Sequence, residues 1–151
     1  MSKPHLIAAG GLTFKDDVVL LVRYQESKGG TYLVGPGGAL EDEENVVQAI
    51  VRETREETGL TVQPKKVVAI EDLVGSRFKM SKVWMTCEVV NGQISNTEGA
   101  KKEGIIEVGW FTREQLAGEV VFPPTLMQHE WAQLQADGWT VECLPSRKMD
   151  F

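Results

Sequence analysis

The sequence predicts an α/β fold in a single domain, and three observations support this prediction. Short apolar segments typical of strands occur before and after a longer segment with helical periodicity. The chain has 151 residues, which is enough for one domain with a sizeable core. Its composition, 42% hydrophobic and 25% charged residues, is typical of a globular protein. We therefore expect residues 1–151 to form one domain, although the spacing of the segments does not decide between a parallel and a mixed sheet.

The expected strands are rich in β-branched and aliphatic residues and are separated by turn-forming residues. They comprise residues 6–14, 16–24, 31–34, 67–74, 82–90 and 105–111. Gly35-Pro36-Gly37-Gly38 is expected to interrupt regular structure, and the polar segment 94–104 is expected to form a loop. Two short helices are predicted after the last strand, at residues 113–117 and 124–136.

The main helix is predicted at residues 43–58, and Gly59 is expected to cap its C-terminus. At about 100° per residue, Glu53, Glu56 and Glu57 fall on one face of this helix. A second face is predicted to pack on the sheet, and it carries Val47, Ile50, Val51 and Thr54. Carboxylates three and four positions apart repel one another and destabilise a helix. Either this face is solvated, or a divalent cation such as magnesium or manganese relieves the repulsion.

Composition excludes several other classes of function. The net charge of −6 and the pI near 5.0 argue against DNA binding, which needs a basic surface. A zinc site is not expected, because the chain has two histidines and its two cysteines lie far apart. No apolar segment approaches the roughly 18 residues of a membrane span, and no secretory signal is recognisable. A cytoplasmic protein with reduced thiols is therefore the expectation.

Residues 38–60 resemble the Nudix box, whose pattern is G-x5-E-x7-R-E-U-x-E-E-x-G-U with U a bulky aliphatic residue. Eight positions match, namely Gly38, Glu44, Arg52, Glu53, Glu56, Glu57, Gly59 and Leu60. Thr54 departs from the pattern at its first U position, where its methyl group is still apolar. A dinucleotide-binding glycine motif fails here, because Leu40 stands where a glycine is required. The resemblance implies an α/β/α sandwich with a mixed central sheet.

The resemblance also implies hydrolysis of a nucleoside diphosphate linked to another group. Glu56, Glu57 and the carbonyl of Gly37 would then be metal ligands for Mg²⁺, or alternatively Mn²⁺. Glu53 would be a further ligand or the base that activates water, and Arg52 would orient it. Structural roles in the box would fall to Glu44, as the partner of Arg52, and to Gly59. Gly38 and Arg23 are the expected substrate contacts, although a salt bridge is an equally good interpretation of Arg23.

Members of this family often add an acidic residue from a segment before the last core strand. The sequence offers Glu98, Glu103 and Glu107, and we select Glu103 as a catalytic candidate. Three aromatic residues could stack on a base, but at alternating strand positions such residues more often belong to the core: Phe78, Trp84 and Phe122. The stretch VFPPTL is similar to a loop of nucleotide-sanitising members, yet Leu126 replaces the asparagine that reads an oxidised purine there.

The predicted function is therefore a metal-dependent pyrophosphohydrolase, acting as a monomer or homodimer on a small nucleotide. Candidate substrates are a modified nucleoside triphosphate, a nucleotide sugar or a dinucleoside polyphosphate. One alternative is a nucleotide-sensing module of the same fold without turnover, which would tend to lose the carboxylates of the box. Another is removal of pyrophosphate from RNA 5′ ends, against which the acidic charge balance counts.

Overall fold

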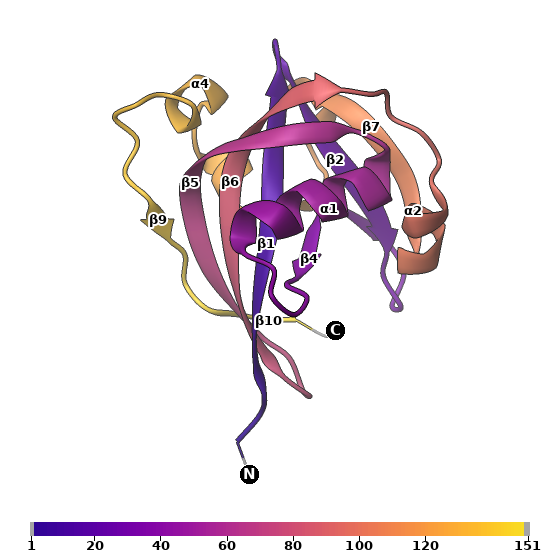
Figure 1. Cartoon of the computed structure of the whole chain (residues 1–151), viewed down its shortest axis with the longest axis vertical. Helices are drawn as coiled ribbons and strands as arrows, with labels where there is room; N and C mark the ends of the chain where they lie inside the picture. The colour runs from indigo at the N-terminus through magenta and orange to yellow at the C-terminus, as the bar shows by residue number, and fades with distance from the viewer. Residues whose placement is uncertain (1, 150–151) are drawn as a thin grey trace.

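A computed structural model describes residues 2–149. Its strands form one strongly curled, mixed sheet, and helices lie on both sides of it (Figure 1). The strands are β1 (His5–Lys15), β2 (Val18–Gln25), β3 (Thr31–Val34), β4 (Gly37–Ala39), β5 (Thr61–Val74), β6 (Lys79–Asn91), β7 (Ile105–Thr112), β8 (Val121–Phe122), β9 (Glu142–Cys143) and β10 (Arg147–Lys148). The helices are α1 (Val46–Thr58), α2 (Glu98–Glu103), the 3-10 helix η1 (Glu114–Leu116), α3 (Thr125–Gln128) and α4 (Trp131–Leu134).

The long strand β1 joins the two halves of the sheet. It pairs in parallel with β6 and in antiparallel fashion with β2 and β4. The full order is β10-β5-β6-β1-β2-β3-β8, with β4 beside β1, β7 beside β2 and β9 beside β5. The mixed character of the sheet, which the segment spacing alone did not decide, follows from these pairings.

Two apolar cores lie on opposite sides of the sheet. One packs Ala49 and Ile50 of α1 against Ala9 and Leu20. The other contains Leu12, Leu21 and Trp84 from the sheet, together with residues of the C-terminal helices, namely Leu126, Trp131 and Leu134. Apolar surface of the sheet is thus buried on both faces, which is what makes a three-layer arrangement stable. Among residues 2–149, no helix has both the length and the apolarity that a membrane span would require.

Helix α1 begins at Val46 rather than at the predicted residue 43. Asn45 caps the helix: its side chain accepts from the Gln48 backbone N–H at 2.8 Å, while Gln48 accepts from the Asn45 N–H at 3.0 Å. Glu43 has a φ of 65° and therefore lies outside the helix. At the other end, Gly59 has a φ of 87° and its N–H reaches the Arg55 carbonyl at 2.9 Å, as a C-terminal cap should.

Several other boundaries differ from the sequence prediction. The glycine segment does not simply interrupt the structure, because Gly37–Ala39 forms β4 against residues 8–10. Within the predicted loop 94–104, Thr97 caps the short helix α2 and Gly104 ends it with a φ of 82°. The predicted helix 124–136 is divided into α3 and α4 by extended backbone at His129. Strands β5 and β6 begin earlier than predicted, and β8, β9 and β10 were not predicted.

Candidate active site

The floor of the site is the short strand β4, where glycine is required for close approach. Gly38 lies opposite Ala9 in β1, and a Cβ added to Gly38 would lie 2.7 Å from Oε1 of Glu53. A Cβ on Gly37 would overlap the backbone carbonyl of Ala9. The absence of side chains at both positions therefore lets the first strand and the acidic helix lie against the same segment.

Arg52 binds several carboxylates of the box and holds them in place. Its guanidinium binds Glu44 through two hydrogen bonds, of 2.7 Å from Nε and 2.9 Å from Nη2. Nη1 reaches Oε1 of Glu53 at 2.8 Å and Oε2 of Glu56 at 3.3 Å. The hydrogen bonds from Arg52, together with one from the Glu41 backbone N–H, lower the pKa of Glu44 to about 2. Glu44 therefore stays ionised and holds Arg52 in position beside Glu53.

Glu57 has the most unusual surroundings of the carboxylates in the box. Its side chain is 1% exposed, and neither of its oxygens has a hydrogen-bond partner among residues 2–149. Burial, and next the adjacent Glu53, raise the pKa of Glu57 well above its ordinary value. A buried carboxylate without donors is costly unless a cation compensates it. This environment is therefore suited to a hard divalent cation.

The side of α1 that packs on the sheet differs from the predicted one, because it includes two of the three carboxylates. Glu53 and Glu57 lie on the buried side of α1 with Ile50 and Thr54, whereas Val47 is exposed. The helix packs along a strip that includes acidic positions, because the glycines of β4 leave space beneath it. Among the residues described, no group of three or more His, Cys, Asp and Glu side chains is arranged as a metal site. In this arrangement Arg52 holds Glu53 and Glu56, and Glu57 remains uncompensated.

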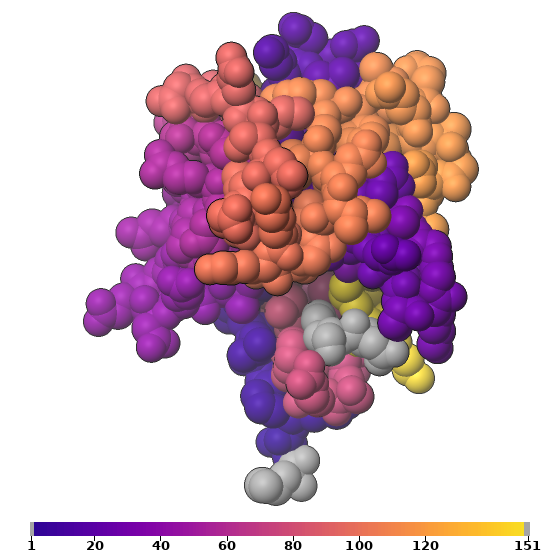
Figure 2. Space-filling model, turned by 90° about the vertical axis from the view of Figure 1, so that its right-hand side faces the viewer, coloured from indigo at the N-terminus to yellow at the C-terminus, as the bar shows by residue number. Residues whose placement is uncertain are grey.

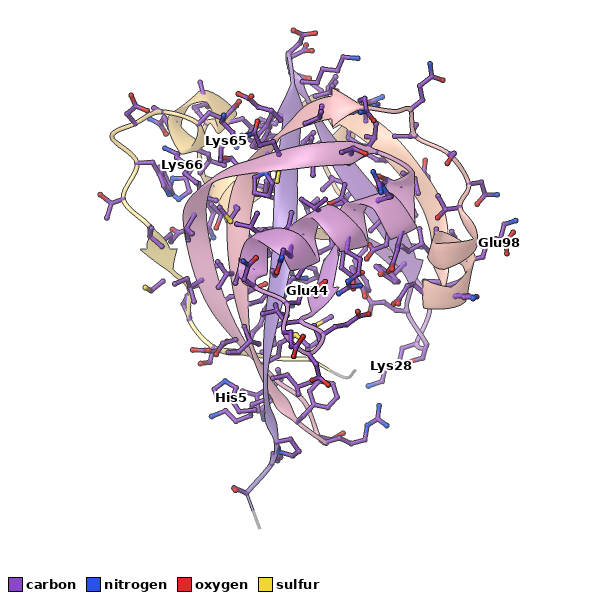
Figure 3. The ribbon with its side chains drawn as sticks, in the orientation of Figure 1. His5, Lys28, Glu44, Lys65, Lys66 and Glu98 are labelled. Carbon is purple, nitrogen blue, oxygen red and sulfur yellow. The ribbon has the colours of Figure 1, made fainter. Side chains whose placement is uncertain are left out.

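The structure distinguishes the three candidates for an additional acidic residue. Glu103, at the end of α2, lines the same pocket as Gly37 and Gly38 of the box, and its pKa is raised by burial and by the charges of Glu53 and Glu56. Glu98 is exposed and pairs with Lys101 at 3.4 Å, and its side chain points away from the sheet (Figure 3). Glu107 receives a hydrogen bond of 2.6 Å from Arg23. Glu103 is therefore the candidate that lies beside the box, and its catalytic role remains a prediction.

Arg23, a predicted substrate contact, is held by protein groups. Its guanidinium binds Glu107 at 2.6 Å, Thr31 at 2.9 Å, and Glu119 at 2.9 and 3.1 Å. These contacts correspond to the salt-bridge interpretation. The substrate role of Arg23 stays a prediction that these contacts do not support.

A pocket of about 350 Å³ opens beside the box, a volume typical of small-molecule sites. Gly37, Gly38 and Glu103 line it on the side of the box. Its other walls bring together residues from β2, β3, β5, β6, β8 and β10, chiefly Tyr24, Tyr32, Glu71, Lys82, Phe122 and Arg147. The sequence did not predict that Glu71, Lys82 and Arg147 line one pocket, because no local pattern indicates that their three distant strands meet. A lone lysine in the apolar strand segment KVWMTC was the one available signal.

Comparison with known proteins assigns the family. The model described as the NUDIX domain matches residues 4–132, which is most of the chain. The chain belongs to the NUDIX domain family. The predicted fold is confirmed by a solved NUDIX hydrolase from Nitrosomonas europaea, to which the chain is 26% identical with a TM-score of 0.65. That match covers 83% of this chain and 85% of the bacterial protein.

Two curated relatives of this NUDIX domain act on nucleotides according to their names. The chain is 25% identical over 112 residues to the 8-oxo-dGDP phosphatase NUDT18 of Mus musculus. It is 28% identical over 98 residues to the ADP-ribose pyrophosphatase of Methanocaldococcus jannaschii. These matches cover 74% and 64% of this chain, but 33% of the mouse protein and 58% of the archaeal protein. The chain thus spans only part of the length of either relative.

Proposed function

We propose that this domain hydrolyses a phosphoric anhydride bond in a nucleoside diphosphate derivative with the help of a divalent cation. The observation that carries the proposal is Glu57, a buried carboxylate with two unpaired oxygens beside Glu53. Membership of the NUDIX domain family and the names of the two relatives support the same reaction class. The adjoining pocket has the size needed for a small nucleotide.

The chemistry of the donor set fits a hard cation. Glu56, Glu57 and the Gly37 carbonyl would hold Mg²⁺ or Mn²⁺, both of which prefer oxygen ligands, and Glu53 would then be the base. When bound, the cation would neutralise phosphate oxygens and make water more acidic. The uncompensated charge of Glu57 is the feature of this chain that such an ion would satisfy.

The chain's own groups would position and deprotonate the attacking water. Glu53 accepts the proton, and the 2.8 Å hydrogen bond from Arg52 holds its carboxylate in place. The water oxygen forms a bond to one phosphorus while the anhydride P–O bond breaks. The departing phosphate takes the bonding electron pair, so the products are a nucleoside monophosphate and the phosphorylated remainder.

The substrate class is a nucleotide derivative of the kind the relatives' names indicate. Leu126 occupies the position at which the nucleotide-sanitising pattern has asparagine, and it is completely buried in the core. This position therefore offers no polar group to an oxidised base. The absence of that group favours ADP-ribose-like or nucleotide-sugar substrates over an oxidised purine nucleotide.

A panel of nucleotides with Mg²⁺ tests the proposal. ADP-ribose, 8-oxo-dGDP, a UDP-sugar and a dinucleoside polyphosphate are incubated with the wild type and with Glu57→Gln, and the products are separated by chromatography. We expect the wild type to release a nucleoside monophosphate from at least one compound, and chelation of Mg²⁺ to stop the reaction. If the wild type hydrolyses no compound faster than Glu57→Gln does, the domain is a binding module rather than a hydrolase.

A further inference from the structure

The pocket beside the box contains a second buried carboxylate, Glu71, whose bonding is complete. Glu71 is 1% exposed, and its Oε1 accepts a hydrogen bond of 3.0 Å from the indole N–H of Trp84. Its Oε2 accepts a hydrogen bond of 3.3 Å from Nε of Arg147. The guanidinium of Arg147 also lies 3.8 Å above the ring of Phe122. Unlike Glu57, this carboxylate is therefore compensated by the protein itself.

Arg147 comes from the C-terminal segment, which extends beyond the region matched by the family model. That match ends at residue 132, whereas Arg147 lies in β10 and is held against Leu73 of β5 by parallel pairing. The backbone N–H of Met149 anchors the same strand through a bond of 3.0 Å to the Val74 carbonyl. In the space-filling view, C-terminal residues in yellow lie between the β2–β3 loop and the β5–β6 hairpin (Figure 2). The segment thus completes one wall of the pocket.

Lys82 lies directly opposite Glu71 on the neighbouring antiparallel strand, yet the two do not pair. Opposite charges at such positions normally attract one another. Within residues 2–149, however, no hydrogen bond and no ion pair within 4.0 Å involves the Lys82 ammonium, which lies 4.3 Å from the centre of the Trp84 ring. Glu71 is instead directed to Trp84 and Arg147. Lys82 therefore presents in the pocket a positive charge whose close contact is with the ring of Trp84 and not with a carboxylate.

The position of Lys82 links the pocket to the box. Its charge acts on Glu57, where it opposes the effect of burial on the pKa of that carboxyl. Burial lowers the pKa of Lys82 itself, and the charges of Glu71 and Glu57 oppose that change. A phosphate placed between the nucleoside pocket and the box would meet this ammonium. The ammonium would gain the charge-assisted hydrogen bonds that the protein does not give it.

We propose that Lys82 binds the phosphate group next to the nucleoside, and that Arg147 keeps Lys82 available by occupying Glu71. This inference rests on the proposed function for the identity of its ligand, a nucleoside phosphate. Lys82 is a substrate-binding residue in this account, whereas Arg147 is a positioning residue that acts through Glu71. The pairing depends on a segment that lies outside the region matched by the family model.

Equilibrium binding tests the role of Lys82 without requiring turnover. AMP, GMP, CMP and UMP are titrated calorimetrically against their unphosphorylated nucleosides, and the ratio of the two affinities isolates the phosphate contact. We expect the wild type to bind at least one monophosphate about tenfold or more tighter than its nucleoside. Lys82→Met should bring this ratio close to one. The matched control is Lys79→Met, which changes an exposed lysine of the same strand and should leave the ratio unchanged. A wild type without phosphate preference, or a Lys82→Met variant that keeps it, would overturn the proposal.

A pair of variants tests the role of Arg147. In Arg147→Gln the released Glu71 should pair with Lys82, so the phosphate preference should fall severalfold. The double variant Glu71→Gln/Arg147→Gln removes the competing carboxylate and should restore the preference, which a merely structural role of Arg147 would not predict. If Arg147→Gln does not fold, Arg147→Lys is the second variant to measure. It retains a cation for Glu71 and should keep the phosphate preference. A double variant as weak as Arg147→Gln would rule out this positioning role.

The two proposals fail in different ways. If monophosphates bind with the expected dependence on Lys82 but the nucleotide panel gives no turnover, the hydrolase proposal fails and the phosphate site stands. If turnover occurs and Lys82→Met binds monophosphates as the wild type does, the hydrolase proposal stands and the phosphate contact lies elsewhere.

Discussion

Glu57 and Glu71 are both buried carboxylates, but they differ in their hydrogen bonding, and this difference indicates which of them lies at the candidate active site. Trp84 and Arg147 satisfy both oxygens of Glu71. The oxygens of Glu57 have no such partner among the residues described. Removal of a buried charge from water without compensation is expensive, so folded proteins retain it mainly where a ligand or ion completes the site. The residue with incomplete bonding is therefore the one to which we assign function.

At the residue scale, the sequence predicted that Arg52 pairs with Glu44 and lies beside Glu53, but not that Glu53 and Glu57 are buried. The spacing of the box identified Glu44, Arg52 and the glutamates that follow them. Angular placement could not show that Glu53 and Glu57 turn toward the sheet, because that depends on space left by Gly38 in another element. Lys82 and Arg147 escaped prediction for a similar reason, since their meeting requires strands that are far apart in sequence.

Glu103→Gln tests the choice among the three additional acidic residues. Glu103 faces Glu53 and Glu56, so its neutralisation should lower kcat/KM by about tenfold to a hundredfold on whichever substrate the panel identifies. Glu98→Gln is the matched control, because Glu98 belongs to the same helix but pairs with Lys101 and does not line the pocket. Steady-state kinetics of both variants provide the measurement. A Glu103→Gln variant within a few-fold of the wild type would remove Glu103 from the site.

At the scale of the elements, segments rich in apolar residues were predicted better than short segments without an apolar pattern. The strands at residues 6–14, 16–24, 31–34 and 105–111 correspond closely to β1, β2, β3 and β7. Helix α2 has six residues and no apolar periodicity, so only its caps at Thr97 and Gly104 could have indicated it. The short strands β4, β9 and β10 form because a neighbouring long strand offers them backbone partners. Such partners cannot be identified from a local pattern.

Gly99→Ala tests how α2 is positioned against α1. A Cβ at Gly99 would overlap the backbone carbonyl of Glu56, so the two helices would have to separate. We expect a loss of about 1–3 kcal/mol in the free energy of unfolding, and a lower kcat because Glu103 moves with its helix. Gly138→Ala is the control, since a Cβ there meets nothing within 4 Å. Urea denaturation of both variants makes the comparison, and equal stabilities would contradict this contact.

At the scale of the whole molecule, the curled sheet encloses one core beneath α1 and another beneath the C-terminal helices. Cys87 lies in the first core, and Cys143 is exposed on β9. The family resemblance predicted the three-layer architecture. It did not predict the C-terminal strands, which lie outside the matched region and complete the pocket.

The two thiols provide a measure of global opening. Burial raises the pKa of Cys87 to about 12, so at pH 8 its reactive thiolate form is scarce as well as shielded. We expect iodoacetamide to modify Cys143 rapidly in the native protein, and Cys87 only after unfolding in urea. Between pH 7 and 9 the native rate at Cys87 should remain low, because this range lies below its pKa. Cys143→Ser should show no rapid labelling, and rapid double labelling of the native wild type would contradict the packing of this core.

The measurement that tests the central claim most directly is the effect of Mn²⁺ on the thermal stability of the wild type and Glu57→Gln. Without a cation, Glu57→Gln should be at least as stable as the wild type, because the substitution removes a carboxyl group whose charged form is disfavoured by burial. With Mn²⁺ at about 100 times its Kd, the wild type should gain about 2.7 kcal/mol in the free energy of unfolding. Glu57→Gln should gain little, while the exposed control Glu88→Gln should behave as the wild type does. An equal response to Mn²⁺ in the wild type and Glu57→Gln, or no response in either, would contradict the assignment of Glu57 as the cation ligand.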